Sequence, residues 1–118
     1  MSTIVTSNVS DGTLSIPTTY VTNGSAKAWC RFDGTGTIAI ESSLNTSSLT
    51  DVGTGDYQIN LTNALDANDG AHFFACANFH SGRASIGSAS IIRVFVADTS
   101  HSLADSSFVV GATFGDLA

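Results

Sequence analysis

The chain has 118 residues, a length that fits one domain with a substantial buried core. Its hydrophobic fraction of 42% excludes a disordered chain, and its four Lys and Arg against ten Asp and Glu disfavour binding to nucleic acid or to anionic membranes. Only 12% of the residues are charged, whereas Ser and Thr account for 31 of the 118. A surface so poor in charge favours a place in an assembly.

The first residues lack both the basic start and the apolar run of a secretory signal peptide. No apolar run of the chain approaches the length that spans a bilayer. We therefore expect a protein that is made in a cytosol and is not inserted into a membrane.

Residues 1–26 form a polar lead-in with turn signals at Asp11, Pro17 and Asn23. The scattered apolar residues of this segment suffice for one or two short strands and for no core of their own. We expect an N-terminal arm over 1–26 that docks on a partner, followed by a β-sandwich domain over 27–118.

Apolar and polar residues alternate from residue 27 onward, which is the pattern of half-buried strands. The first strand is expected to end at a turn at Asp33-Gly34, and a second turn, over 53–56, precedes another alternating run. The apolar side of the two runs is expected to consist of Ala28, Cys30 and Phe32, and of Tyr57, Ile59 and Leu61. After the first turn, Ile38 and Ile40 are expected to resume the apolar side.

Residues 63–71 are expected to form a loop, and three more strands are expected at 72–79, 91–97 and 108–114. No segment shows a sustained helical period. The sequence therefore predicts an all-β fold, with an antiparallel, jelly-roll-like β-sandwich as its finer form.

The strands expected at 91–97 and 108–114 are apolar on both faces. Such strands are usually buried on both faces, whereas a single small sandwich has one interior. We expect the second apolar face to meet a neighbouring copy of the chain, with Phe95 and Val109 among the residues that need this cover.

His72, Cys76 and His80 have the only spacing typical of metal ligands. The phenylalanines around them favour a strand, on which residues four apart lie about 13 Å from one another, too far to share a zinc ion. No metal site and no cofactor are predicted. One His per chain meeting on the axis of a trimer is the alternative.

No catalytic residues are predicted, because no strand–nucleophile–helix turn is present. Glycoside hydrolysis would need Glu41 together with one of the scattered aspartates. Most aspartates stand in turn contexts, where the side chain bonds to the backbone. The alternative for four of them is a calcium cluster built by Asp51, Asp56, Asp66 and Asp69.

Cys30 and Cys76 each lie in an apolar, strand-like run and are interpreted as buried free thiols, with a disulfide as the alternative. Trp29, the single tryptophan, stands between Lys27 and Arg31. We interpret it as a partly buried aromatic at a sheet or subunit interface, with stacking on a sugar as the alternative.

Three motifs follow one another in the order Lys27-Ala-Trp, Asp33-Gly-Thr-Gly and Gly53-Thr-Gly-Asp-Tyr. With the closing run Asp105–Gly115, they resemble a module found in tail fibres and other surface proteins of tailed bacteriophages. The resemblance covers about residues 22–115 and is strongest over 24–65.

The resemblance implies a β-rich, homotrimeric protein of the virion surface, assembled in the host cytoplasm, that is structural or receptor-binding and not an enzyme. It would be a tail-fibre tip or a capsid decoration (head-fibre) subunit, held to other virion proteins by residues 1–26. A host-surface receptor or glycan is the expected further partner. The exposed candidates for recognition are the loops at 33–36, 51–56, 66–71 and 81–87.

Two other functions compete with this one. A stand-alone carbohydrate-binding β-sandwich module would show exposed aromatic side chains and bind glycans as a monomer. A small hydrolase would show a concave site with a perturbed acid or base.

Overall fold

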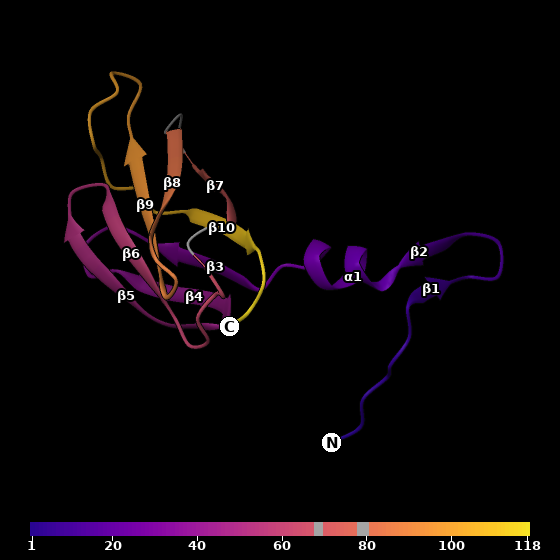
Figure 1. Ribbon diagram of the computed structural model, residues 1–118. Coiled ribbons are helices and arrows are strands. Elements are labelled where there is room, and N and C mark those ends of the chain that lie inside the picture. The colour runs from indigo at the N-terminus through magenta and orange to yellow at the C-terminus, as the bar shows by residue number, and fades with distance from the viewer. Residues whose placement is uncertain (68–69, 78–80) are drawn as a thin grey trace.

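The computed structural model describes residues 1–67, 70–77 and 81–118. Its described elements are ten strands and one helix of seven residues, and the two larger sheets are antiparallel, which confirms the all-β prediction. The chain forms an N-terminal hairpin and helix, followed by a body of two four-stranded sheets (Figure 1).

The first sheet has the strand order β4-β3-β10-β7. The bounds of these strands are Ala28–Asp33 for β3, Ala39–Leu44 for β4, Ala71–Cys76 for β7 and Val109–Phe114 for β10. The first and the last strand of the body, β3 and β10, therefore pair directly at the centre of this sheet.

The second sheet has the strand order β5-β6-β9-β8. The bounds of its strands are Thr46–Gly53 for β5, Asp56–Leu61 for β6, Ser81–Ser88 for β8 and Ile91–Ala97 for β9. Three hairpins, β3–β4, β5–β6 and β8–β9, each stay within one sheet. The edge strands β7 and β8 of the two sheets lie side by side (Figure 1).

One buried cluster joins the inner faces of both sheets. The alternation of apolar residues predicted this, because every second residue of β3, β6 and β9 is buried. The members of the cluster are Ala28, Cys30, Phe32, Tyr57, Ile59, Leu61, Leu65, Ile92, Val94, Val96 and Val109. The predicted sets at 28–32 and 57–61 are thereby confirmed. Ile38 is only partly buried and Ile40 is 37% exposed, which corrects the expectation for Ile40.

Asn45 alone connects β4 of the first sheet to β5 of the second. Its φ of 55° lies in the left-handed region, which asparagine tolerates better than most residues do. The side chain is fixed across the corner, since its Oδ1 accepts a hydrogen bond from the Asn63 backbone N–H at 2.7 Å. This corner lets the chain change sheets within one residue.

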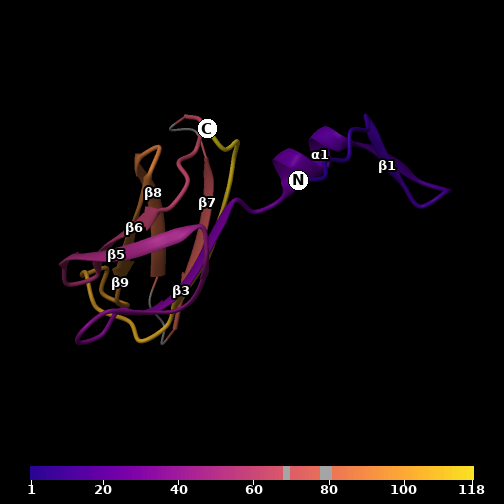
Figure 2. The ribbon, with the colours of Figure 1, turned by 90° about the horizontal axis from the view of Figure 1, so that it is seen from below.

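The N-terminal segment contains β1 (Asn8–Ser10), β2 (Ser15–Pro17) and α1 (Thr18–Gly24). The two short strands pair with each other, as expected, whereas the helix was not predicted. Both views show this segment extending away from the body (Figures 1 and 2). Of the described residues, none between 1 and 26 belongs to the buried cluster.

Several boundaries correct the predictions. The loop expected at 81–87 is strand β8, which pairs with β9 from Ser81 to Ser88. Residues 51–53 and 56 likewise belong to strands, so only a tight turn separates β5 from β6. The strand expected at 72–79 ends at Cys76, and its last two positions lie outside the described residues.

Candidate functional site

The outer face of the first sheet carries a row of apolar side chains. Trp29 is paired with Leu44 on one side and with Ala112 on the other, and Ala112 is paired with Phe73. Directly paired residues project from the same face of a sheet. Because Ala28 and Cys30 point into the core, the row that contains Trp29 faces outward.

These side chains remain accessible in the single chain. Leu44 is 49% exposed, Trp29 37% and Phe73 66%. Phe114, on the same face, packs edge-on against Phe73 with 6.1 Å between the ring centroids. We name Leu44, Trp29, Ala112, Phe73 and Phe114 the apolar face. Exposed apolar side chains gathered on one face mark an interaction surface more often than isolated ones do.

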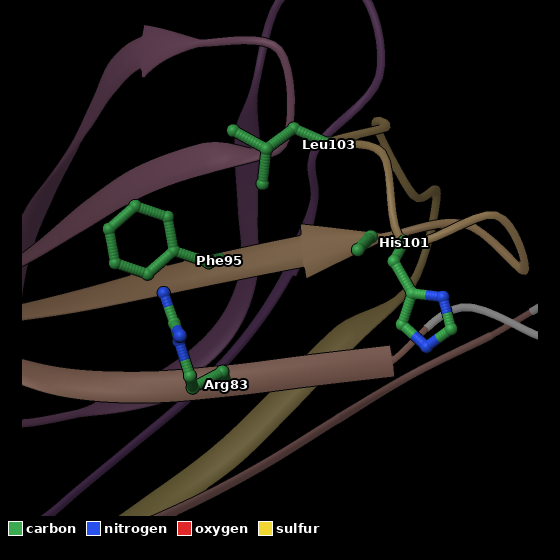
Figure 3. A pocket seen from close by; sticks show the side chains of 5 residues that line it. Arg83, Phe95, His101 and Leu103 are labelled. Carbon is green, nitrogen blue, oxygen red and sulfur yellow. The ribbon is translucent and has the colours of Figure 1, made fainter.

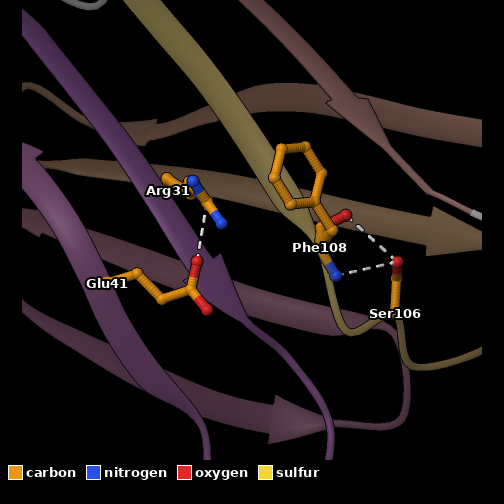
Figure 4. A network of polar contacts seen from close by, with 4 residues as sticks. All are labelled: Arg31, Glu41, Ser106 and Phe108. Atoms are coloured by element: carbon orange, nitrogen blue, oxygen red, sulfur yellow. Dashed lines mark hydrogen bonds and ion pairs between the residues drawn. The ribbon is translucent and has the colours of Figure 1, made fainter.

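A charged pair adjoins the apolar face. Arg31, two residues beyond Trp29, bonds to the carboxylate of Glu41 on β4 at 2.6 Å. Its guanidinium also lies 4.8 Å from the ring centroid of Phe108 (Figure 4). Figure 4 further shows Ser106, whose hydroxyl donates to the Phe108 carbonyl oxygen at 3.1 Å. Glu41, the glutamate considered for glycoside hydrolysis, is thus engaged by an arginine.

The central row of the outer face of the second sheet is polar. The directly paired residues Thr50, Gln58, Arg93 and Ser85 form one row across its four strands. Arg93 binds Asp56 through two hydrogen bonds, of 2.8 and 2.6 Å. This pairing raises the pKa of Arg93 above its ordinary value, chiefly through the hydrogen bond to Asp56.

The two residues expected to need cover by a neighbouring chain behave differently. Val109 is 0% exposed within its own chain, so the expectation for this residue is wrong. It lies on the inner face of β10, opposite Phe32 of β3. The expectation was wrong because alternation alone could not tell which face of this strand is the inner one. Phe95 lies on the outer face of β9 and is partly exposed, with the guanidinium of Arg83 5.1 Å and that of Arg93 5.2 Å from its ring centroid.

The N-terminal segment presents a second set of uncovered apolar side chains. Leu14 is 73% exposed and Tyr20 70% exposed. The remaining members are Met1, Ile4, Val5, Val9, Ile16 and Val21. A hairpin and a short helix with this composition cannot bury these side chains within themselves, which fits a segment that packs on a partner.

The two Gly-Thr-Gly turns meet at one end of the body. The Tyr57 hydroxyl lies 2.8 Å from the Gly34 carbonyl oxygen and 2.7 Å from the Asp105 carboxylate, and either oxygen can accept its single proton. The same carboxylate accepts the Gly55 N–H at 2.8 Å. Burial and the neighbouring Asp105 raise the pKa of Tyr57, which keeps the hydroxyl protonated.

Neither turn has room for a side chain at its buried glycine. A Cβ on Gly34 would lie 2.5 Å from the Tyr57 hydroxyl oxygen, and a Cβ on Gly55 would lie 2.4 Å from the Val96 carbonyl oxygen. The motifs that carry the resemblance therefore include glycines that allow close packing, Gly34 against Tyr57 of the other sheet and Gly55 against the backbone of Val96. Exposed positions of these turns, such as Thr35, remain available to a partner.

His72 and Cys76 of the predicted metal spacing lie on β7, and His80 lies outside the described residues. The Nδ1 atom of His72 is 2.9 Å from the Thr113 hydroxyl oxygen, whereas its buried Nε2 has no hydrogen-bond partner among the described residues. Burial lowers the pKa of His72, which favours the neutral ring.

Both cysteines are free thiols. Cys30 is buried, as interpreted, and Cys76 is only partly buried. Burial raises the pKa of the Cys30 thiol to about 11, so the group stays protonated at neutral pH. Neither thiol has the depressed pKa of a reactive cysteine.

The aspartates considered for a calcium cluster are used differently. Asp56 binds Arg93, and Asp51 and Asp66 are exposed. Asp69 lies outside the described residues. Within residues 1–67, 70–77 and 81–118, no three His, Cys, Asp or Glu side chains gather as metal ligands.

Sequence reasoning identified Trp29 and missed its neighbours Leu44 and Phe73 as members of the same surface. Each occupies an outward position of its strand. The available signal was the alternation within β7, where Phe73 and Phe74 fall on opposite faces and cannot both be buried in one core.

Comparisons with family models, with curated proteins and with solved structures found no match for this chain. The described residues include no helix with the length and apolar character needed to cross a membrane.

Proposed function

We propose that this chain is a non-enzymatic structural protein of a bacteriophage virion, displayed on the particle surface. It acts as a homotrimeric tail-fibre tip or as a capsid decoration (head-fibre) subunit, which stabilises the particle or contacts the host. Residues 1–26 serve as the arm that docks on other virion proteins, and residues 27–118 form the displayed domain.

The observation that carries this proposal is the uncovered apolar face, with Trp29 37% and Phe73 66% exposed. Removing apolar surface from water contributes about 25 cal/mol per Å² in favour of assembly, against which the entropic cost of association counts. The opposite outer face, by contrast, is polar and suits contact with water. Packing between copies would cover the first face and leave the second exposed.

The proposed domain is a β-sandwich, because both sheets contribute to one core. The pairing of β3 with β10 supports a jelly-roll-like description, since a jelly roll also places its first and last strands together. The hairpins that stay within one sheet depart from a strict jelly roll.

The phage setting rests on the resemblance of residues 22–115. The Gly-Thr-Gly turns and the Gly-Asp-Tyr sequence have a structural role, because Tyr57 of the second sheet lies within hydrogen-bonding distance of Gly34 beside the first sheet, and Gly55 bonds to Asp105. This role gives a physical reason for a module of this kind to contain these motifs. The uncovered arm adds a segment suited to docking.

The test has two steps. Light scattering of the purified full chain should give the mass of three 12.1-kDa chains, about 36 kDa. Co-sedimentation with purified phage particles and with tailless heads should then show binding that a chain lacking residues 1–26 no longer shows. Binding to tailless heads would select the decoration subunit over the fibre tip.

A stable monomer that binds neither particles nor host cells would contradict the proposal. A monomer that binds glycans would instead support the second candidate, a stand-alone carbohydrate-binding module. Exposed Trp29 and partly exposed Phe95 are the aromatic side chains that favour this candidate.

A further inference from the structure

A small pocket of about 260 Å³ opens on the outer face of the second sheet, away from the apolar face. Its lining residues are Arg83, Phe95, Ala97, His101 and Leu103. Figure 3 shows the guanidinium of Arg83 reaching toward Phe95, with His101 and Leu103 on the loop that follows β9.

The loop that supplies His101 and Leu103 is held by its own hydrogen bonds. The Asp98 carboxylate accepts the backbone N–H groups of Ser100 and Ser102 at 2.8 and 3.1 Å. The His101 N–H donates to the Asp98 carbonyl oxygen at 3.0 Å, and Leu103 forms a β-bridge with Ala97. The pocket wall is therefore ordered before any ligand arrives.

His101 also has an unusual backbone conformation, with a φ of 64°. Residues other than glycine adopt this region rarely, and such residues gather at functional sites. His101 is exposed and is one of the residues that line the pocket.

Arg83 differs from the other cations of the chain. Arg31 binds Glu41 and Arg93 binds Asp56, while Lys27 donates to the carbonyl oxygens of Thr22 and Ser25. Arg83 stacks on Phe95 and has no carboxylate partner among the described residues. The aromatic ring orients this guanidinium without neutralising it.

The acidic groups beside the lining residues are already engaged. Asp105, two residues after Leu103, accepts the Gly55 N–H at 2.8 Å and lies 2.7 Å from the Tyr57 hydroxyl oxygen. Asp56 is bound by Arg93, and the Asp98 carboxylate accepts the N–H groups of its own loop. The unneutralised fork of Arg83 is therefore available to a carboxylate from outside the chain, which it can bind through two parallel hydrogen bonds.

We propose that this pocket binds a carboxylate-bearing monosaccharide, such as the uronic acid unit of a glycan. Arg83 binds the carboxylate, and His101 contacts a ring hydroxyl. Leu103 supplies the apolar wall against which the C–H face of the sugar packs, together with the part of the Phe95 ring that the guanidiniums of Arg83 and Arg93 leave open. The volume suits one sugar ring better than an extended peptide, which would need a longer groove.

This inference adds a ligand site to the proposed function and does not depend on the virion setting. The pocket belongs to one chain, and the apolar face proposed to join the copies lies on the other sheet. Binding can therefore be measured whatever the oligomeric state is, and its failure leaves the proposed assembly untouched.

The test is a titration of the full-length protein with methyl glucuronide, followed through the backbone amide signals in NMR. We expect shifts at Arg83, His101 and Leu103 and a Kd on the order of 1 mM, as for other ligands of this size. Methyl glucoside, which has the same ring without the charge, should bind at least about tenfold more weakly, because it cannot engage the Arg83 fork.

The variant Arg83→Gln should weaken glucuronide binding by about tenfold or more. Arg31→Gln is the matched control, because Arg31 also stacks on a phenylalanine but lies on the other sheet beside Glu41. It should leave binding unchanged.

Equal changes in amide chemical shift with the glucuronide and the glucoside would overturn the proposal. An equal loss of glucuronide affinity in Arg83→Gln and Arg31→Gln would also overturn it. N-acetylglutamate bound as tightly as the glucuronide would overturn the assignment to a sugar in favour of a protein carboxylate.

Discussion

The outer faces of the two sheets contrast, although both sheets contribute to one core. The face of β4-β3-β10-β7 presents Trp29 and Phe73 to its surroundings, whereas the face of β5-β6-β9-β8 presents Gln58, Arg93 and Asp56. Both faces come from strands with the same alternating pattern. Alternation therefore divides each strand into two faces, and the composition of the outward positions decides whether a face suits water or a partner.

The largest effect is expected at a glycine whose surroundings leave no room for a side chain. Gly55→Ala should destabilise the fold by about 4 kcal/mol, because the φ of +64° disfavours a side chain and the new Cβ would collide with the Val96 carbonyl oxygen. Urea unfolding measures this change. Gly36→Ala is the matched control, since its φ is +59° and its surroundings are open. It should cost only about 1 kcal/mol.

The second prediction sharpens the contrast between the faces. The double variant Trp29→Ser, Phe73→Ser should weaken self-association at least about 100-fold, because aromatic anchors dominate interface energies. Analytical ultracentrifugation measures the shift toward the monomer. Gln58→Ser with Thr50→Ser on the polar face is the control and should leave association unchanged. Equal behaviour of the two double variants would remove the apolar face from the interface.

The third prediction concerns the core beneath the apolar face. The pKa of Cys30 is raised by burial to about 11 in the folded chain, against about 8.5 in an unfolded one. The protonated thiol therefore contributes stability fully below pH 8.5 or so, and this contribution is lost as pH rises toward 11. Between pH 8 and pH 10 we expect a loss on the order of 1 kcal/mol.

Urea unfolding at the two pH values checks this slope. Cys30→Ala should be less stable at both pH values, because it leaves a small void, and should show a smaller loss between them. An unchanged slope in this variant would assign the alkaline loss to other groups, of which Tyr57 is one, because its raised pKa acts in the same direction above pH 10.

The smallest expected effect is a difference in stability between variants of the two ion pairs on the outer faces. Arg31→Gln should change stability by no more than about 0.5 kcal/mol, because Arg31 and Glu41 are both well exposed. Arg93→Gln should cost more, since it leaves the carboxylate of Asp56, only 14% exposed, without its two hydrogen bonds. Thermal unfolding of the two variants at equal ionic strength compares the two costs. An equal cost would mean that the pairing of Asp56 adds nothing beyond that of a surface pair.

Much of the fold could be predicted from local pattern. The strand expected at 91–97 is β9, and Tyr57, Ile59 and Leu61 are buried as their alternation indicated. Strand β8 was missed because Ser81–Ser88 is rich in serine and glycine and carries no alternation of its own. It is a strand because β9 offers it a ladder of backbone partners.

The candidate surfaces were only partly predictable. Trp29 was identified from its sequence neighbours, whereas its grouping with Leu44 and Phe73 depends on the pairing of strands far apart in sequence. The pocket at Arg83 was even less predictable, because it is formed by β8, β9 and a loop whose backbone N–H groups bond to Asp98. No feature of the local sequence indicates that Arg83 has no acidic partner among the described residues.

By itself, the sequence determined the all-β class and the buried residues of the alternating runs at 28–32 and 57–61, since these follow from side-chain size and from the two-residue period of a strand. Tertiary structure alone decided that Val109 lies inside its own chain and that Phe73 lies outside. The physical reason is that alternation divides a strand into two faces without marking which is the inner one. Only the pairing order of the strands sets which face meets the other sheet.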